Sequence, residues 1–194
     1  PLTQEGAVFI PRVQMLGYPL DIVVIRHQLF VVGLLARHRE VFKHLLTGLS
    51  EDEVRWKPDP EKWCALEIIC HLHDEEREDF RARVRSVLES PESPFTKIDP
   101  PAWVRERGYM QKDFNGMLDN FLMERERSVD RLRGLKAPKW TNANKHPTVG
   151  PVSAELLLAN WLAHDLHHFR QLNNLRYGYL ADTSGQPMDY AGKW

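Results

Sequence analysis

The stretch WLAHDLHHFRQL, residues 161–172, places three histidines among apolar side chains within about three turns of a helix. At 100° per residue, His164 and His168 lie 40° apart and about one turn apart in height. Trp161 and Leu175 fall on the same stripe, which is therefore expected to face the protein interior. A buried imidazole that finds no partner costs about 1–3 kcal/mol. Histidines on such a stripe therefore need a hydrogen-bond partner or a ligand.

The other polar residues of this stretch are expected on different faces. Gln171 lies close to the stripe of the two histidines, where its side chain could hydrogen-bond to them. His167 is rotated about 60° to one side and is expected at the surface or just behind the two histidines. Asp165 is rotated about 100° to the other side, away from the centre of the stripe.

Working outward, the chain shows four strongly helical segments and few strand signals. The expected helices span roughly 25–46, 63–88, 112–135 and 153–176. Ser153 is the expected N-cap of the last helix, and Gly178 its expected end. The connections SPESPFTKIDPPAW and KAPKWTNANKHPTVGP are long. The sequence therefore predicts an all-α, four-helix bundle with long end connections, within residues 25–178, between an N-terminal extension (1–24) and a C-terminal tail (179–194).

Composition excludes several classes of partner. The chain has 194 residues and a net charge of −1, and acids are interleaved with the arginines of REDFRARVR, as on solvated helix faces. We therefore expect no nucleic-acid partner. IVVIRHQLFVVGLLA is too short and too interrupted to span a membrane, and it lacks the order of a signal peptide. Cys64 and Cys70 are expected to point to different sides of their helix and therefore not to pair. Unpaired cysteines are typical of a reducing cytoplasm.

A second helix contributes a third inward histidine. In EIICHLHDEERED, His71 shares a face with Ile68 and Glu75, whereas His73 is rotated 200° and should look outward. Two histidines at HxxxH spacing also arise by chance, so the argument depends on this third residue. Three neutral imidazoles from two helices can hold one divalent cation and leave a fourth position open. An iron site with two histidines and Glu75 stays open as an alternative.

Two segments resemble a known family. PDPEKWCALEIICHLHDEE and HPTVGPVSAELLLANWLAHDLHHFRQL, about 80 residues apart, are similar to two segments of the DinB-like (DinB/YfiT) metalloenzyme family, and the similarity extends over about Leu34 to Tyr177. The resemblance implies a four-helix bundle with a divalent metal ion (Zn, Ni or Fe) held by His71, His164 and His168. Cys64 stands where the family has a serine, a departure at the helix start rather than at the ligands.

The resemblance implies less about the reaction. Some relatives are transferases or isomerases that use a low-molecular-weight thiol, so we expect a metal-dependent enzyme of thiol-transferase or hydrolase type acting on a small-molecule substrate. Glu75 would orient the nucleophile, and His146 could reach the mouth of the site from its loop. The alternative is a non-catalytic bundle whose ion is structural or sensory. A closed cage of four ligands, completed by His38, would favour that alternative. The sequence leaves open whether the protein forms a homodimer.

Overall fold

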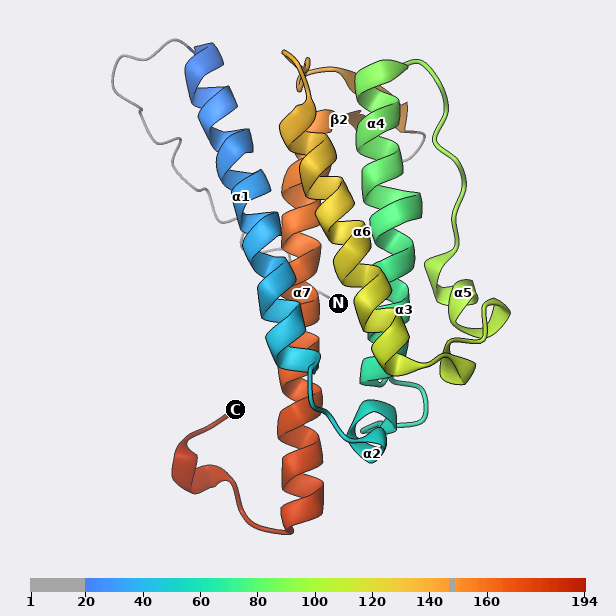
Figure 1. The fold of residues 1–194 in the computed structure, drawn as a ribbon, viewed down its shortest axis with the longest axis vertical. Helices are drawn as coiled ribbons and strands as arrows, with labels where there is room; N and C mark the ends of the chain where they lie inside the picture. The colour runs from blue at the N-terminus through green and yellow to red at the C-terminus, as the bar shows by residue number, and fades with distance from the viewer. Residues whose placement is uncertain (1–19, 147–148) are drawn as a thin grey trace, which may run out of the picture.

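The computed structural model describes residues 20–146 and 149–194, and the side chains from residue 28 onward. Four long rods form an all-α bundle, which confirms the predicted fold class (Figure 1). Three of them are α1 (Leu20–Leu46), α6 (Phe114–Gly134) and α7 (Ala154–Ser184). The fourth is continuous but has three parts, α3 (Ala65–Glu75), η1 (Glu76–Phe80) and α4 (Arg81–Glu89). Three short helices lie in the connections, namely α2 (Glu51–Arg55), α5 (Pro100–Glu106) and η2 (Tyr109–Gln111), and η3 (Asp189–Ala191) follows α7.

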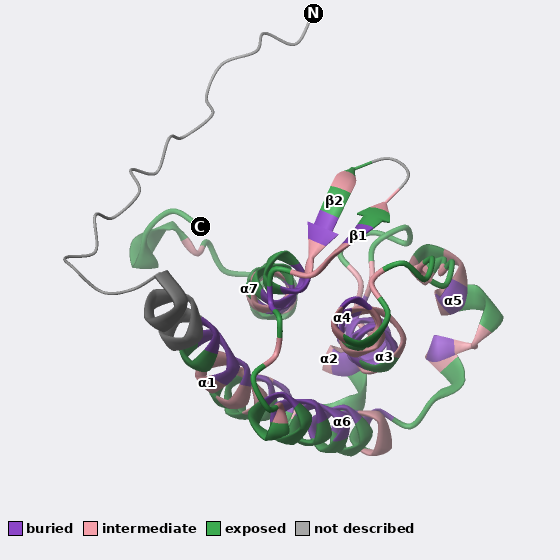
Figure 2. Ribbon diagram, turned by 90° about the horizontal axis from the view of Figure 1, so that it is seen from above, coloured by how far each residue is buried: buried purple, intermediate pink, exposed green. Residues whose placement is uncertain are grey.

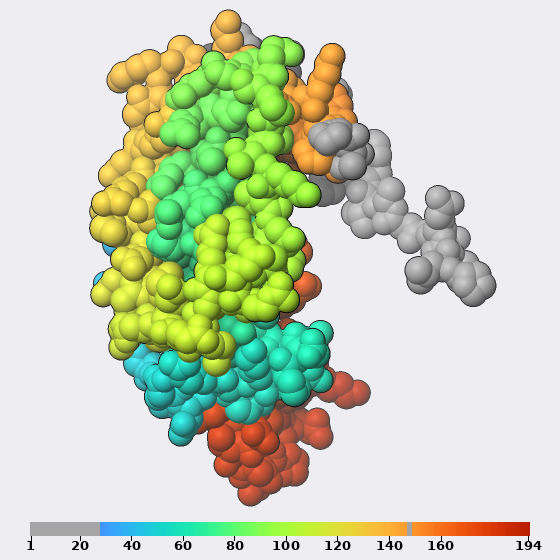
Figure 3. All heavy atoms as spheres, turned by 90° about the vertical axis from the view of Figure 1, so that its right-hand side faces the viewer, coloured from blue at the N-terminus to red at the C-terminus, as the bar shows by residue number. Residues whose placement is uncertain are grey.

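The rods lie at four corners, in the order α1, α6, α3–η1–α4 and α7 (Figure 2). The α3–η1–α4 rod and α6 run in the same direction, opposite to α1 and α7 (Figure 1). Parallel neighbours need a connection that travels the length of the bundle. The predicted proline-rich connection does this, since residues 90–113 run along the outside of the α3–η1–α4 rod and include α5 (Figures 1 and 3).

Side-chain caps fix where several helices begin. The hydroxyl of Ser153 accepts a hydrogen bond from the Leu156 N–H, which places the start of α7 where the sequence predicted it. Asp113 caps α6 in the same way through the Gly116 N–H. At the start of α3, the Cys64 N–H donates to the side chain of Glu67. The serine-to-cysteine departure from the family pattern therefore lies at a helix cap, as expected.

The end of α7 was predicted wrongly. The helix continues through Gly178 to Ser184 and ends at Gly185, whose φ of 61° supplies the left-handed C-cap. Gly178 serves a close contact instead, because a Cβ there would lie 2.7 Å from the Trp56 ring. The predicted tail thus begins later than residue 179. The predicted extension at 1–24 lies largely outside the described residues, and α1 already begins at Leu20.

A small hairpin replaces part of the loop predicted before α7. Strands β1 (Ala143–His146) and β2 (Gly150–Ser153) pair antiparallel, with Asn144 opposite Val152. Both of these residues are buried, and the Asn144 amide donates to the carbonyls of Pro91 and Ser93 at 2.8 and 2.6 Å. The hairpin therefore joins the loop after α4 to the start of α7 at one end of the bundle (Figure 1).

The core consists of two apolar clusters. One surrounds Phe42, Leu72 and Phe121, and the other surrounds Leu35 and Trp161. Three charged residues, Glu76, Arg125 and Asp165, are also almost fully buried. Within residues 20–146 and 149–194, no helix has the length and apolar character needed to cross a membrane.

Candidate metal centre

Three predicted histidines meet between α3 and α7. The Nε2 atom of His164 lies 3.3 Å from Nε2 of His71 and 3.1 Å from Nε2 of His168. One ring nitrogen from each of the three lies within 4.8 Å of the others, and among the described residues this is the group that could hold a metal ion. We refer to these three residues as the histidine cluster. Its members come from two rods, as the spacing predicted.

The spacing of the nitrogens suits a divalent cation. Ligands at 2.0–2.1 Å from a tetrahedral zinc ion lie about 3.3–3.4 Å from one another, and an octahedral face brings them slightly closer. The two Nε2 separations that involve His164 lie close to this range, and the His71 and His168 nitrogens lie within 4.8 Å of each other. The cluster contains no carboxylate or thiol among the described residues. The donor set therefore resembles a three-histidine site with an open position rather than a closed cage.

The histidine cluster is held in the neutral form that a metal ion requires. Burial lowers the pKa of His71 to about 3, with a further contribution from His168. Burial and the two neighbouring imidazoles lower the pKa of His164 to about 2, and burial lowers that of His168 to about 4. At neutral pH all three rings therefore offer a lone pair.

Hydrogen bonds and ring contacts orient two of these imidazoles. His168 Nδ1 lies 2.9 Å from Oε1 of Gln171, so Nδ1 carries the proton and Nε2 keeps its lone pair. Gln171 thus lies where the sequence placed it. The ring of Trp63 packs on His71, with centroids 4.8 Å apart. His71 Nδ1 is buried and has no hydrogen-bond partner in the described part of the chain. Bonding of its Nε2 to a cation would offset the cost of burying this ring.

Glu75 is buried, but its carboxyl group is paired elsewhere. It shares a hydrogen bond with Asp79, and burial together with the Asp79 charge raises the pKa of Glu75 to about 8. Glu75 is not a member of the histidine cluster. The structure therefore does not bring together the alternative iron site of two histidines and Glu75. The predicted role of Glu75 in orienting a nucleophile stays a prediction.

The remaining histidines lie outside the cluster. His38 points inward as expected, but its Nδ1 lies 3.0 Å from Oδ2 of Asp165, so it does not complete a cage of four ligands. His167 is exposed, whereas His73 is partly buried and contacts Asp74. His146 lies in β1 and accepts a hydrogen bond from the Val149 N–H.

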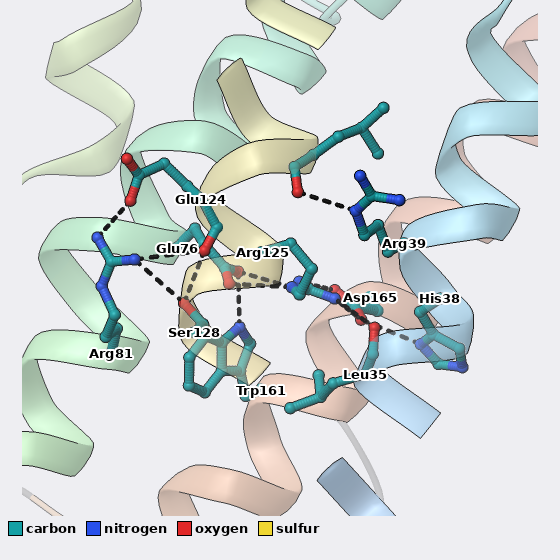
Figure 4. A network of polar contacts seen from close by, with 11 residues as sticks. Leu35, His38, Arg39, Glu76, Arg81, Glu124, Arg125, Ser128, Trp161 and Asp165 are labelled. Atoms are coloured by element: carbon teal, nitrogen blue, oxygen red, sulfur yellow. Dashed lines mark hydrogen bonds and ion pairs between the residues drawn. The ribbon is translucent and has the colours of Figure 1, made fainter. Parts of the chain in front are cut away.

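A buried polar network surrounds Arg125 (Figure 4). The Arg125 guanidinium donates two hydrogen bonds to Asp165, at 2.7 and 2.8 Å, and contacts both carboxylate oxygens of Glu76 at 3.0 Å. Trp161 Nε1 also donates to Glu76 at 3.0 Å. Burial opposes the ionised form of Asp165, but Arg125 and His38 outweigh it and lower its pKa. Because Asp165 follows His164 in α7, this network fixes the helix segment that carries two cluster members.

This network was not predicted from the sequence. Arg125 lies in MERERS, residues 123–128, which looks like a solvated face because acids alternate with arginines. Helical spacing carried a usable signal, because Arg125 falls between the apolar residues Phe121 and Val129 at steps of four. Asp165 falls four residues after Trp161 in the same manner. A charged residue at the centre of an apolar stripe in each of two helices predicts a buried ion pair between them.

Comparison with known proteins agrees with the fold. A solved structure of YfiT from Bacillus subtilis, described as "a probable metal-dependent hydrolase with an unusual four-helix bundle topology", superposes with a TM-score of 0.70. It covers 89% of this chain and 93% of its own, at 16% sequence identity. No curated protein gave a significant match. The family model of the DinB superfamily matches residues 34–172, which include the whole histidine cluster. The chain belongs to the DinB superfamily.

Proposed function

We propose that this protein is a metal-dependent hydrolase that acts on a small molecule. The observation that supports this most strongly is the histidine cluster itself, with two Nε2 separations of 3.1 and 3.3 Å and no fourth protein ligand in the described part of the chain. A structural ion is usually enclosed by four protein ligands, whereas a catalytic ion keeps a position for water or substrate. The description of YfiT as a probable metal-dependent hydrolase supports the same proposal.

The histidines of this chain would bind and orient the metal ion, and the Glu75–Asp79 pair could hold a proton. When bound, a divalent cation supplies Lewis-acid chemistry and lowers the pKa of water at its open position to about 7. His71, His164 and His168 would hold it through Nε2, with the His168 ring fixed by Gln171. Glu75, protonated against Asp79 near neutral pH, would store a proton one helical turn after His71.

The alternative activity is thiol transfer, in which a low-molecular-weight thiol would take the open position. Its ligands are the same, so the two activities differ only in the group that enters. Cys64 and Cys70 are both buried and form no disulfide, which supports work in a reducing compartment such as the cytoplasm, where such thiols are abundant.

Metal content tests the centre directly. Alanine substitutions of His71, His164 and His168 should each remove most of the bound zinc, nickel or iron from the purified protein, as measured by elemental analysis. Alanine substitutions of His73 and His167 serve as matched controls, because they remove an imidazole from the same two helices outside the cluster, and they should retain the metal. Full metal retention by His168→Ala would exclude the proposed centre.

Reactivity then separates the candidate functions. A cobalt-substituted sample should change its visible spectrum on addition of small carboxylic, phosphoric or amide substrate analogues if the site is a hydrolase. A change with a low-molecular-weight thiol alone would favour thiol transfer instead. A spectrum that no small ligand perturbs would indicate a coordinatively closed ion and contradict both enzymatic proposals.

A further inference from the structure

A groove lined mainly by arginines runs between the α3–η1–α4 rod and α6. Its volume is about 430 Å³, and its lining comprises Arg77, Arg81, Ala82, Arg85, Glu124, Arg127 and Arg131. Figure 3 shows the two elements that form it, α4 in green and α6 in yellow, side by side on one face of the molecule. No member of the histidine cluster lines the groove. It is therefore a separate feature of the surface.

Helical spacing aligns the arginines in two rows. Arg77, Arg81 and Arg85 recur at steps of four along one rod, and Arg127 and Arg131 do the same on α6. Between Arg81 and Arg85, which both lie in α4, a step of four residues rises about 6 Å along the helix. Like charges at this spacing destabilise a helix, and the facing row adds further repulsion. Such an arrangement favours an anion that spans both rows.

The acids near the groove neutralise only part of its charge. Glu124 is the one carboxylate in the lining, and it is shared between Arg81 at 2.5 Å and Arg127 at 2.6 Å. Arg131 pairs with Glu89 outside the lining.

The other two arginines are left with little neutralisation. Arg77 lies 3.8–3.9 Å from Asp74 and Glu78, and Arg85 forms no ion pair within the described part of the chain. The lining holds five guanidinium groups and one carboxylate, and Asp74, Glu78 and Glu89 beside it offset part of this excess of positive charge.

We propose that this arginine groove binds a small anion that carries two or more linked phosphate groups. Guanidinium groups present paired N–H donors that match phosphate oxygens, and several of them can engage neighbouring phosphates at once. The groove is short and local, which suits a diphosphate or triphosphate better than a polymer. From the sequence, the arginines of REDFRARVR were expected on solvated helix faces, but the parallel packing of α4 and α6 brings two rows of arginines together.

Calorimetric titration tests the proposal with inorganic pyrophosphate and tripolyphosphate as probes. The protein is first treated with a chelator, because oligophosphates would otherwise compete for metal at the histidine cluster. We expect one pyrophosphate per chain, tighter binding of tripolyphosphate, at least tenfold weaker binding of orthophosphate, and affinity that falls as salt rises. The absence of binding, or orthophosphate binding as tight as that of pyrophosphate, would overturn the proposal.

Charge-matched variants locate the site. The double variant Arg85→Ala with Arg127→Ala should weaken pyrophosphate binding at least tenfold, and both side chains are exposed enough to leave the fold intact. The control is Arg37→Ala with Arg133→Ala, which removes the same charge from exposed positions outside the groove. Equal losses in the two variants, or unchanged binding in the first, would overturn the assignment.

A titration with ADP distinguishes a free oligophosphate from a nucleotide as the source of the linked phosphate groups. ADP binding with the affinity of pyrophosphate would show that the phosphates alone are recognised. Tighter ADP binding that is equally sensitive to Arg85→Ala with Arg127→Ala would identify a nucleotide as the ligand. Loss of the metal from the histidine cluster should change neither result, so failure here is distinguishable from failure of the hydrolase proposal.

Discussion

Replacement of Arg125 by methionine should destabilise the protein severely. Arg125 is 1% exposed and compensates the two carboxylates of Glu76 and Asp165, which are equally buried. Methionine fills much of the same volume, so the main effect is the loss of the cation. Removal of one partner from a buried ionic group costs about 3–5 kcal/mol. For a chain of this length the melting temperature should fall by roughly 6–20 °C.

Urea denaturation followed by far-UV circular dichroism measures this loss on the metal-free protein. The matched control is Arg127→Met, on the same helix, because its ion pair with Glu124 leaves the arginine 59% exposed. That change should cost less than about 1 kcal/mol. Adding Asp165→Asn and Glu76→Gln to Arg125→Met should recover part of the stability, since neutral side chains are cheaper to bury. A loss below about 1 kcal/mol for Arg125→Met would refute the reasoning.

Further predictions concern the metal centre and the packing of α7. Gln171→Leu should weaken metal binding about 10- to 100-fold with the fold retained, because His168 loses the hydrogen bond that orients it; competition with a chromophoric chelator measures this, and unchanged affinity would contradict it. The metal-free protein should lose stability as the pH falls from about 6.5 to 4, by about 1.4 kcal/mol per pH unit for each cluster histidine, because the unfolded chain binds protons there that the folded cluster excludes; pH-dependent urea melts with a flat profile would argue against it. Gly178→Ala should lower stability by about 1–3 kcal/mol despite better helix propensity, and Trp56→Ala in the same chain should remove that penalty; a stabilising Gly178→Ala would show that the Trp56 ring moves aside freely.

The part of the site that the sequence predicted depends on local spacing. A step of four residues in one helix fixes the relation of His164 to His168 before any packing is known. His71 was found because it repeats the same inward setting in a second helix. The partner of Gln171 followed from the same periodicity. The relations within α7 survive any rearrangement of the bundle, whereas the meeting of His71 with the other two histidines also depends on how α3 is rotated about its axis.

What the sequence did not predict depends on contacts between distant segments. The role of Gly178 is visible only when Trp56, more than a hundred residues earlier, is seen against it. His38 looked like a fourth ligand because it faces inward, yet its partner is Asp165. The arginine groove requires α4 and α6 to be parallel neighbours, which the lengths of the connections allow but do not impose.

The π turn at Glu76–Phe80 has a consequence for how this chain could vary in length. The Arg81 N–H bonds back to the Glu76 carbonyl, five residues earlier, so the turn contains an inserted residue relative to an α-helix. Deleting it would rotate the preceding segment about 100° against the following one. If Val84 kept its place, His71 would then turn away from α7. If His71 kept its place, Val84 would turn out of the core. A helix without the inserted residue would need its ligand one position away along α3 to face α7.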